Sequence, residues 1–569
     1  MNTKTTKKGE RLEHFRALYE NAKNAYGENL ELMTKYLRQY RGDTAIDGSA
    51  ERAAATRNIT YEIVESQVCS DIPSPKADAA YYSEKRERAA QSIERLCYSL
   101  RNSLPFAELN DLDERYTYIY GGSVWYIEWD NDKRLGLEVG GVKIHCLSPL
   151  DFIPQPEIFT VEDMEYCFLK FTTTREELVR KYGISEEDTY LAECLKENAN
   201  FDTGDTVSVI LAFYKGEGGA VGRFVFSGDL ILSDIENYYS RKALVCTVCG
   251  EREELCRCEK PAFIPYDERY EYLPDEMGGS KVPYYLPSRF PIVIRRNTST
   301  EKSLLGQSDC EYIRPEQQAI NKIETRILQK LLRAGITPIV PEDASVSINN
   351  SVFGQVIKMK PGESMAQYGK VDTTPDISQD IAEAERLYDH AKRILGISDS
   401  YQGIGEYAGE SGYARQLRIT QSSGRLLSKK KMKNAAYSKI DRIIFEHYLA
   451  FADEPRNLAY KDGLGRIHDE TFNRYDFLCF DSEKKEFYYD DAYIFSSDLS
   501  AGTEMARDEI WQKNLENLKA GTLGDPTQPV TLLRYWQAQE KAHYPSARDN
   551  VEYFLELCGK GGVKDGEEE

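Results

Sequence analysis

Four cysteines in the segment CTVCGEREELCRC form the densest group of reactive side chains in the sequence. They are Cys246, Cys249, Cys256 and Cys258. A C-x2-C pair directs two thiolates at one tetrahedral metal ion, and a second pair after a short gap, here C-x-C, can complete the shell. Soft thiolates favour zinc, and four of them leave no open position for water. The spacing predicts a structural zinc (Zn2+) site, with a metal-free thiol pair or another metal as the alternatives.

A second chemical group is a basic run from Ser411 to Lys439 that contains no acidic residue. Its cations are Arg415, Arg418, Arg425, Lys429, Lys430, Lys431, Lys433 and Lys439. Such a run is either a solvated helix face that pairs with neighbouring acids or a surface that contacts a phosphate backbone. Consecutive lysines point in different directions around a helix, so they cannot all serve one partner.

Signatures of catalysis are weak in this sequence. It contains no G-x-x-x-x-G-K-[ST] phosphate loop. The segment GIGEYA, which starts at Gly403, fits a loose dinucleotide pattern but follows an expected helix, whereas that pattern must follow a strand. The six histidines show no paired metal-ligand spacing. We therefore expect no enzymatic activity.

Composition narrows the class of protein further. The chain has 569 residues, of which 41% are hydrophobic and 29% charged, and its formal net charge is −21. This length predicts about three to five domains, and the negative charge argues against a protein that coats nucleic acid. No stretch approaches the roughly 18 apolar residues of a membrane helix, so no membrane association is expected. We expect a reducing cytoplasm, where cysteines are thiols or metal ligands.

Hydrophobic periodicity and the positions of glycine and proline predict a mixed α+β fold. Helices are expected at 8–40, 80–103, 310–335, 376–395, 411–452, 501–519, 528–542 and 546–557, with short ones in 173–199. Strands are expected in 114–153, 205–235, 336–372 and 474–495. Two long helices thus flank a small β-insert, and a Gly-rich loop follows the second one.

This order of elements resembles the portal proteins of tailed double-stranded DNA bacteriophages. The segment SLLGQSDCEYIRPEQQAINKIETRILQKLLRAG is similar to the first stem helix of that family, which begins with a small and acidic run and a Pro-x-Gln turn. The segments RNITYEIVESQVCSDIPSPKA, VKIHCLSPLDFIPQP and GESGYARQL carry the resemblance further, so that it spans roughly 10–555. The four-cysteine segment is outside the usual pattern.

The resemblance implies a multi-domain portal architecture: an α/β wing, a two-helix stem, a small β-containing clip and a helical crown. The implied parts are wing 1–308 with the four-cysteine insertion at about 240–262, stem helices 309–334 and 376–395, clip 335–375, channel loop 396–410, a long bent helix and wing β-region at 411–499, crown helices 500–557 and a disordered tail 558–569. The channel-loop residues would be Gly403, Gly405, Tyr407 and Gly409.

The resemblance also implies a function without catalysis. Portals assemble in the host bacterial cytoplasm as homo-oligomeric rings, typically of twelve subunits, and become part of the virion at one capsid vertex. Double-stranded DNA passes through the ring during packaging and ejection. The ring contacts the terminase large subunit, head-completion or adaptor proteins, the major capsid protein and scaffolding protein. The basic run would then contact DNA or, as we favour, pair with acids between subunits. The alternative is a zinc-ribbon nucleic-acid-binding or regulatory protein.

Overall fold

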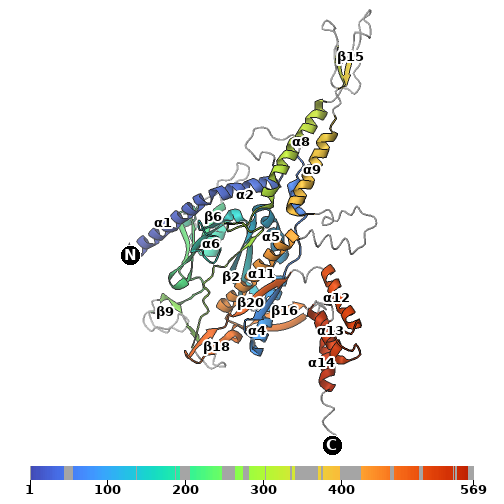
Figure 1. The fold of residues 1–569 in the computed structure, drawn as a ribbon. Coiled ribbons are helices and arrows are strands. Elements are labelled where there is room, and N and C mark those ends of the chain that lie inside the picture. Colours follow the sequence, from blue (N-terminus) through green and yellow to red (C-terminus); the bar gives the residue numbers. More distant parts are fainter. Residues whose placement is uncertain are drawn as a thin grey trace, which may run out of the picture. The chain divides into compact units, whose positions relative to one another are not determined.

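The computed structural model is a mixed helix and strand structure, as expected for an α+β protein (Figure 1). It describes residues 2–43, 56–81, 83–135, 138–185, 187–192, 206–246, 263–268, 270–272, 281–301, 303–333, 336–339, 369–372, 376–397, 424–461, 467–498, 504–541, 544 and 547–561. The chain divides into two compact units. Unit 1 comprises residues 1–33, 68–308 and 426–569, and unit 2 comprises residues 34–67 and 309–425.

A five-stranded antiparallel sheet forms one layer of unit 1. Its strands are β4 (Phe152–Pro154), β5 (Tyr166–Thr174), β6 (Thr206–Lys215), β7 (Val221–Ser227) and β8 (Leu230–Ile235), in that spatial order. Helix α1 (Asn2–Ala25) packs on this sheet, where Phe15 stacks on Phe224 with ring centroids 4.6 Å apart. The strands expected in 205–235 are confirmed.

A three-stranded sheet forms the second layer of unit 1. It contains β13 (Ile292–Arg296), β2 (Gly122–Leu135) and β3 (Glu138–Leu147), in that order. One main core packs α4 (Glu84–Ser103) and α11 (Gly424–Phe451) against it. At its centre Trp125 of β2 meets Tyr437 of α11 edge to face at 5.5 Å. Burial of each such ring stabilises the fold by about 1.5–3 kcal/mol, so the C-terminal half of the chain completes the core of the N-terminal half.

Short antiparallel strand pairs and four further helices belong to the rest of unit 1 within the described residues. The strand pairs are β1 (Ser74–Ala79) with β20 (Tyr493–Asp498), β9 (Arg241–Cys246) with β10 (Phe263–Glu268), β11 (Tyr270–Tyr272) with β12 (Lys281–Pro283), β16 (Arg456–Lys461) with β17 (Ile467–Phe472), and β18 (Leu478–Asp481) with β19 (Glu486–Tyr489). The helices are α6 (Arg175–Tyr182), α12 (Glu504–Lys519), α13 (Pro529–Lys541) and α14 (Ala547–Gly561). The helices expected near the C-terminus are confirmed.

Two details of the sequence-based expectation are wrong. The strand expected from residue 114 begins only after helix α5 (Phe106–Tyr120), which Gly121 ends with a φ of +89°. The alternating aromatics of RYTYIY suggested a strand, but in the helix Tyr116 and Tyr120 are neighbours one turn apart. The expected helix 8–40 is interrupted at Tyr26, and α2 (Gly27–Tyr40) follows.

Unit 2 contains an antiparallel pair of long helices. They are α8 (Arg314–Arg333), which follows the short α7 (Asp309–Tyr312), and α9 (Ser378–Leu395) (Figure 1). Strands β14 (Ile336–Ile339) and β15 (Gly369–Asp372) lie between these two helices in the sequence and pair with each other in antiparallel orientation. The two long helices expected from periodicity are confirmed. Residues 34–67, expected with the wing, belong to this unit and contribute α3 (Ile59–Glu65).

Candidate functional site

The helix pair of unit 2 starts from a rigid polar junction. Gln317, two residues after Pro315, is buried on α8. Its Oε1 accepts hydrogen bonds from the backbone and hydroxyl of Thr60, both at 3.0 Å, and its Nε2 donates to Asn321 and to the Arg57 carbonyl, both at 2.8 Å. A fully satisfied buried amide fixes one geometry, because any shift leaves a polar group unpaired. Gln317 therefore locks α3 onto the base of α8.

An apolar contact and a polar contact between side chains accompany this junction. Ile59 and Ile63 of α3 are fully buried against Ile320 of α8 and Leu395 of α9. His390 of α9 lies 2.9 Å from Glu316 of α8. The sequence identified the Pro-x-Gln turn only as part of a resemblance, and it missed α3 as the third element of this base.

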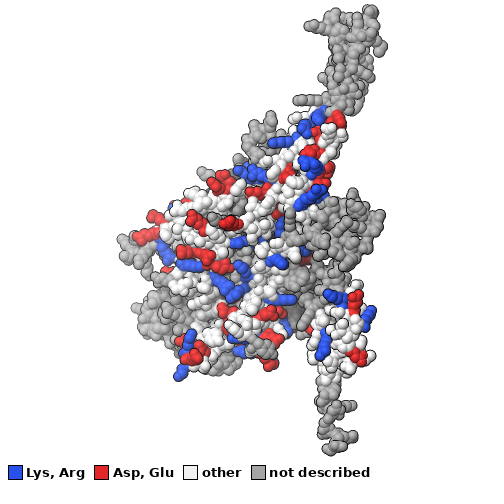
Figure 2. All heavy atoms as spheres, in the orientation of Figure 1, with Lys and Arg blue, Asp and Glu red and all other residues white. Residues whose placement is uncertain are grey.

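The other end of the helix pair combines charge with exposed apolar surface. Asp380 of α9 accepts hydrogen bonds from Lys330 and Arg326 of α8, and the bond from Lys330 is the main cause of a pKa below the usual range for Asp380. Close to this ion pair, Leu331 is 49% exposed and Ile381 is 46% exposed. Figure 2 shows both signs of charge interspersed along the pair. The two helices do not fully cover their own apolar faces at this end.

The basic run divides between the protein interior and its surface. Lys433 is buried, with its Nζ 2.9 Å from a carboxylate oxygen of Glu114 and 2.7 Å from the Asp71 carbonyl. Lys429 is also buried, with its Nζ 5.0 Å from the centre of the Tyr118 ring. Both lysines therefore serve the core of their own unit. For these two residues, burial within their own unit argues against the predicted contact with DNA or a neighbouring subunit.

Lys433 belongs to a buried cluster of four charges. Arg295 bridges Asp113 and Glu114, and the side chains of all four residues are at most 2% exposed. Burial opposes ionisation of Glu114, but the charges of Arg295 and Lys433 outweigh it, so the pKa of Glu114 falls below its usual value. Two cations and two carboxylates make the cluster neutral, and removing any member would leave an uncompensated charge.

The remaining described cations of the run lie nearer the surface. Lys439 forms an ion pair with Glu162 at 2.9 Å. Lys431 is exposed and Lys430 is partly exposed. Among the cations of the run whose side chains are described, these two have no acidic group within 4.0 Å in the described residues. Arg425 is in the first turn of α11, but its side chain lies outside the described residues, as do Arg415 and Arg418 entirely.

The predicted zinc site lies mostly outside the described residues. Cys246 ends β9, and its Cα pairs with that of Phe263 at the start of β10. The hairpin register therefore brings the two ends of the 247–262 segment to adjacent strands, while Cys249, Cys256 and Cys258 lie in that segment. Elsewhere in the described residues, no group of three or more His, Cys, Asp or Glu side chains is placed to hold a metal. The predicted channel-loop residues Gly403, Gly405, Tyr407 and Gly409 also lie outside the described residues.

No protein-family model matches the sequence, and a search of curated proteins finds no match. Within the described ranges, no helix has both the length and the apolar character needed to span a bilayer.

Proposed function

We propose that this chain is a portal protein: it forms a ring, of about twelve copies by the family resemblance, at one vertex of a bacteriophage capsid. Viral DNA would enter and leave through the ring. The ring would dock the terminase large subunit during packaging and head-completion or tail proteins afterwards. In this assignment α8 and α9 are the stem, and β14 and β15 belong to the clip.

The observation that carries the proposal is the helix pair with paired strands at one end. An antiparallel pair of 20 and 18 residues, with β14 and β15 paired between its helices in sequence, matches the stem and clip order of the resemblance. At about 1.5 Å per residue each helix is roughly 27–30 Å long. Two such helices cannot enclose a core alone, because each buries only one stripe of its surface.

Exposed apolar residues at the strand end of this pair support assembly with other copies. Leu331 and Ile381 are each about half exposed, and they directly follow Lys330 and Asp380, which form an ion pair. In a ring, one face of each stem would meet a different face of the neighbouring stem, and these side chains would be buried in that contact. A single copy exposes them to water at a cost of about 1 kcal/mol or more each.

The distribution of charge supports a conduit over a nucleic-acid-binding protein. A channel must let DNA slide, and each phosphate contact by lysine or arginine increases affinity through counterion release. The chain carries −21 overall, and Lys429 and Lys433 of its most basic segment are buried. The zinc-ribbon alternative would need that segment as an accessible binding surface.

Particle shape tests the proposal directly. Purified full-length protein should elute at the mass of a ring in light-scattering chromatography and show annuli with a central hole in negative stain. Leu331→Glu with Ile381→Glu should shift it toward smaller species. Val139→Glu, at a similarly exposed apolar residue of unit 1, is the matched control and should leave rings intact. A folded monomer at high concentration, with no annuli, would refute the proposal.

The predicted channel loop gives a separate test in assembling phage. Replacing Gly403 and Gly405 by alanine should leave rings intact but reduce packaged DNA, because glycine provides backbone freedom that alanine lacks. Normal DNA filling in that variant would argue against the channel-loop assignment while leaving the ring itself untouched.

A further inference from the structure

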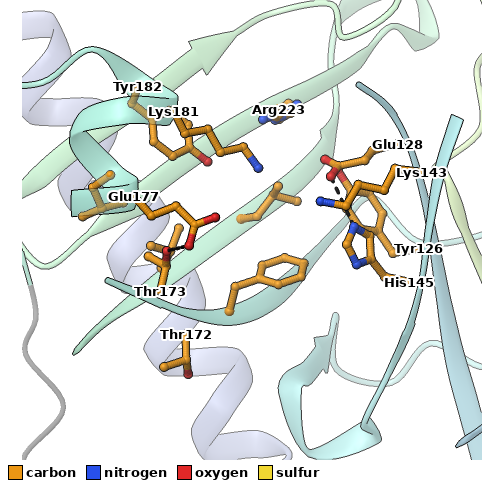
Figure 3. Close-up of a pocket in the computed structure, with 14 residues that line it drawn as sticks. Tyr126, Glu128, Lys143, His145, Thr172, Thr173, Glu177, Lys181, Tyr182 and Arg223 are labelled. Carbon is orange, nitrogen blue, oxygen red and sulfur yellow. Dashed lines mark hydrogen bonds and ion pairs between the residues drawn. The ribbon is translucent and has the colours of Figure 1, made fainter. Parts of the chain in front are cut away.

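A cavity in unit 1 lies between its two sheets and helix α6, and has a volume of about 160 Å³ (Figure 3). The pairing of β2 with β3 places Tyr126 opposite His145 and Glu128 opposite Lys143. Alternate residues of a strand share one face, so these four side chains face the cavity together. Nothing in the proposed portal function uses this group, which is set by the register of the hairpin.

Two further cations come from the other side of the cavity. Lys181 belongs to α6 and Arg223 to β7. Figure 3 shows the ammonium groups of Lys143 and Lys181 pointing toward one another across the space. In the described part of the chain, no carboxylate lies within 4.0 Å of Lys143, Lys181 or Arg223, and the buried Nε of Arg223 has no hydrogen-bond partner. The cavity thus gathers three permanent positive charges without a direct counter-ion.

The two carboxylates of the cavity are already engaged. Glu128 accepts a hydrogen bond from the Tyr126 hydroxyl at 3.1 Å and lies 3.3 Å from His145. Burial alone would raise the pKa of Glu128, but the His145 contact and the charge of Lys181 lower the pKa to about 2. Glu177 accepts a hydrogen bond from the Thr173 hydroxyl at 2.8 Å. With its pKa lowered, Glu128 is ionised at neutral pH, and the three cations Lys143, Lys181 and Arg223 outnumber the two acidic side chains that line the cavity.

We propose that this cavity binds a tetrahedral oxyanion, either free phosphate or the phosphate group of a small monoester. Two ammonium groups that face each other repel, and an anion between them turns that repulsion into attraction. Charge-assisted hydrogen bonds from lysine and arginine to phosphate are among the strongest in proteins. The volume exceeds that of several water molecules. The three cations come from three different elements. They can therefore approach a tetrahedral anion, with four oxygens, from several directions, whereas a planar carboxylate offers only two oxygens.

The apolar part of the lining favours the monoester over free phosphate. Phe171, Leu178, Val209 and Leu211 line the same cavity, and they can cover an organic group attached to the phosphate. All of these residues belong to unit 1 of one chain, so the cavity is complete without a second copy.

Calorimetric titration of the full-length protein tests this proposal. The probes are inorganic phosphate, phenyl phosphate and succinate, each at constant ionic strength because salt screens the charges. Phosphate should bind, phenyl phosphate should bind more tightly, and succinate should bind more weakly than either. Lys181→Met should weaken phosphate binding about tenfold or more. Arg180→Met removes a charge from the same helix at an 83% exposed side chain, whose acidic neighbour at 4.0 Å is the half-exposed Glu177. An exposed ion pair of this length contributes little, so this variant should change binding less than twofold.

A second variant separates binding from folding. Arg223→Met is the stronger test of the interior, and circular dichroism with thermal melting should show that it folds before its affinity is compared. Lys181 is exposed on α6, so Lys181→Met keeps the test decisive even if Arg223→Met fails to fold. Three results would each overturn the proposal: no heat from either phosphate at millimolar concentration, equal effects of Lys181→Met and Arg180→Met, or tighter binding of succinate than of both phosphates.

Discussion

Replacing Lys433 with methionine should destabilise unit 1 strongly, because the lysine completes a buried, neutral cluster. Methionine fills a similar volume but removes the positive charge from Glu114, which is 1% exposed in its side chain. Arg295 then faces two carboxylates alone, those of Asp113 and Glu114. Breaking a buried pair by removing one partner costs about 3–5 kcal/mol, and we expect a loss in that range.

The neighbouring Lys431→Met is the matched control. Lys431 lies on the same helix and carries the same charge, but it is exposed. Surface substitutions of this kind change stability by about 0.5 kcal/mol or less. Urea unfolding followed by tryptophan fluorescence measures the difference, and Trp125, one of four tryptophans in the chain, donates a hydrogen bond to Asp113 of the cluster at 2.9 Å.

The double variant Lys433→Met with Glu114→Gln isolates the cause. It leaves Arg295 paired with Asp113, so the net charge of the cluster returns to zero and part of the lost stability should be recovered. Equal stability of Lys433→Met and Lys431→Met would refute the argument. In that case the basic run would be interchangeable along its length, as a uniform surface for DNA would be.

The effect of Lys433→Met should also depend on pH. In the wild type the pKa of Glu114 is below its unfolded value, so its ionisation stabilises the fold above about pH 4.3 and this contribution is lost as pH falls through the folded pKa. In the variant, burial without Lys433 would raise the pKa of Glu114 in the folded state. The folded state then becomes less stable as the pH rises through the pKa of Glu114 in the unfolded chain, because only the unfolded chain can ionise freely there. The stability difference should therefore narrow toward acid and widen toward neutral pH.

Three further predictions concern other parts of the chain. Gly121→Ala should lower the free energy of unfolding by about 4 kcal/mol or more, because a Cβ there would lie 2.2 Å from a carbonyl oxygen at a φ of +89°. Its control is Gly183→Ala, which has a φ of +64° but open space around the Cβ, and should lose only about 1–2 kcal/mol. Thermal or urea unfolding measures both. Gln317→Ala should lose about 1–3 kcal/mol through the unpaired Thr60 groups, against little change for the exposed Gln329→Ala, by the same assay. Elemental analysis of protein made without chelator should find one zinc per chain, and Cys256→Ser should lower that content; the same content in both would exclude this cysteine as a ligand.

Local sequence signals predicted most of the helices and the main strands. The two stem-like helices have apolar residues at helical spacing, and Gly396 ends α9 in the left-handed conformation that glycine favours. Strands β6 and β7 are apolar runs separated by a Gly-rich turn. The error at residues 114–120 arose where alternation and helical spacing coincide, since Tyr116, Tyr118 and Tyr120 satisfy a strand pattern while only tertiary packing decides for α5.

The functional interpretation of single residues could not be predicted from local patterns. Lys429, Lys430, Lys431 and Lys433 are equivalent in the sequence, yet two are buried and two are partly or fully exposed. Their burial differs because of tertiary contacts with segments that are distant in the sequence. The Asp71 carbonyl that Lys433 contacts, for example, lies 362 residues earlier. The cavity shown in Figure 3 likewise combines residues of the hairpin β2–β3 with residues of α6 and β7, and no local sequence pattern indicates that these elements come together.

Buried and exposed charge therefore carry different meanings in this chain. A buried cation such as Lys433 forms an ion pair with a carboxylate of its own unit, so its substitution should change the stability of that unit. The facing ammonium groups of Lys143 and Lys181 have no carboxylate within 4.0 Å among the described residues, so substitution of either lysine should change ligand affinity instead. The apolar pair Leu331 and Ile381 follows the same logic for association, since their burial would require another molecule. Lys433 should therefore affect stability, Lys181 ligand affinity, and Leu331 with Ile381 the size of the assembly. A substitution that changed a different one of these three quantities would disprove the role of that residue.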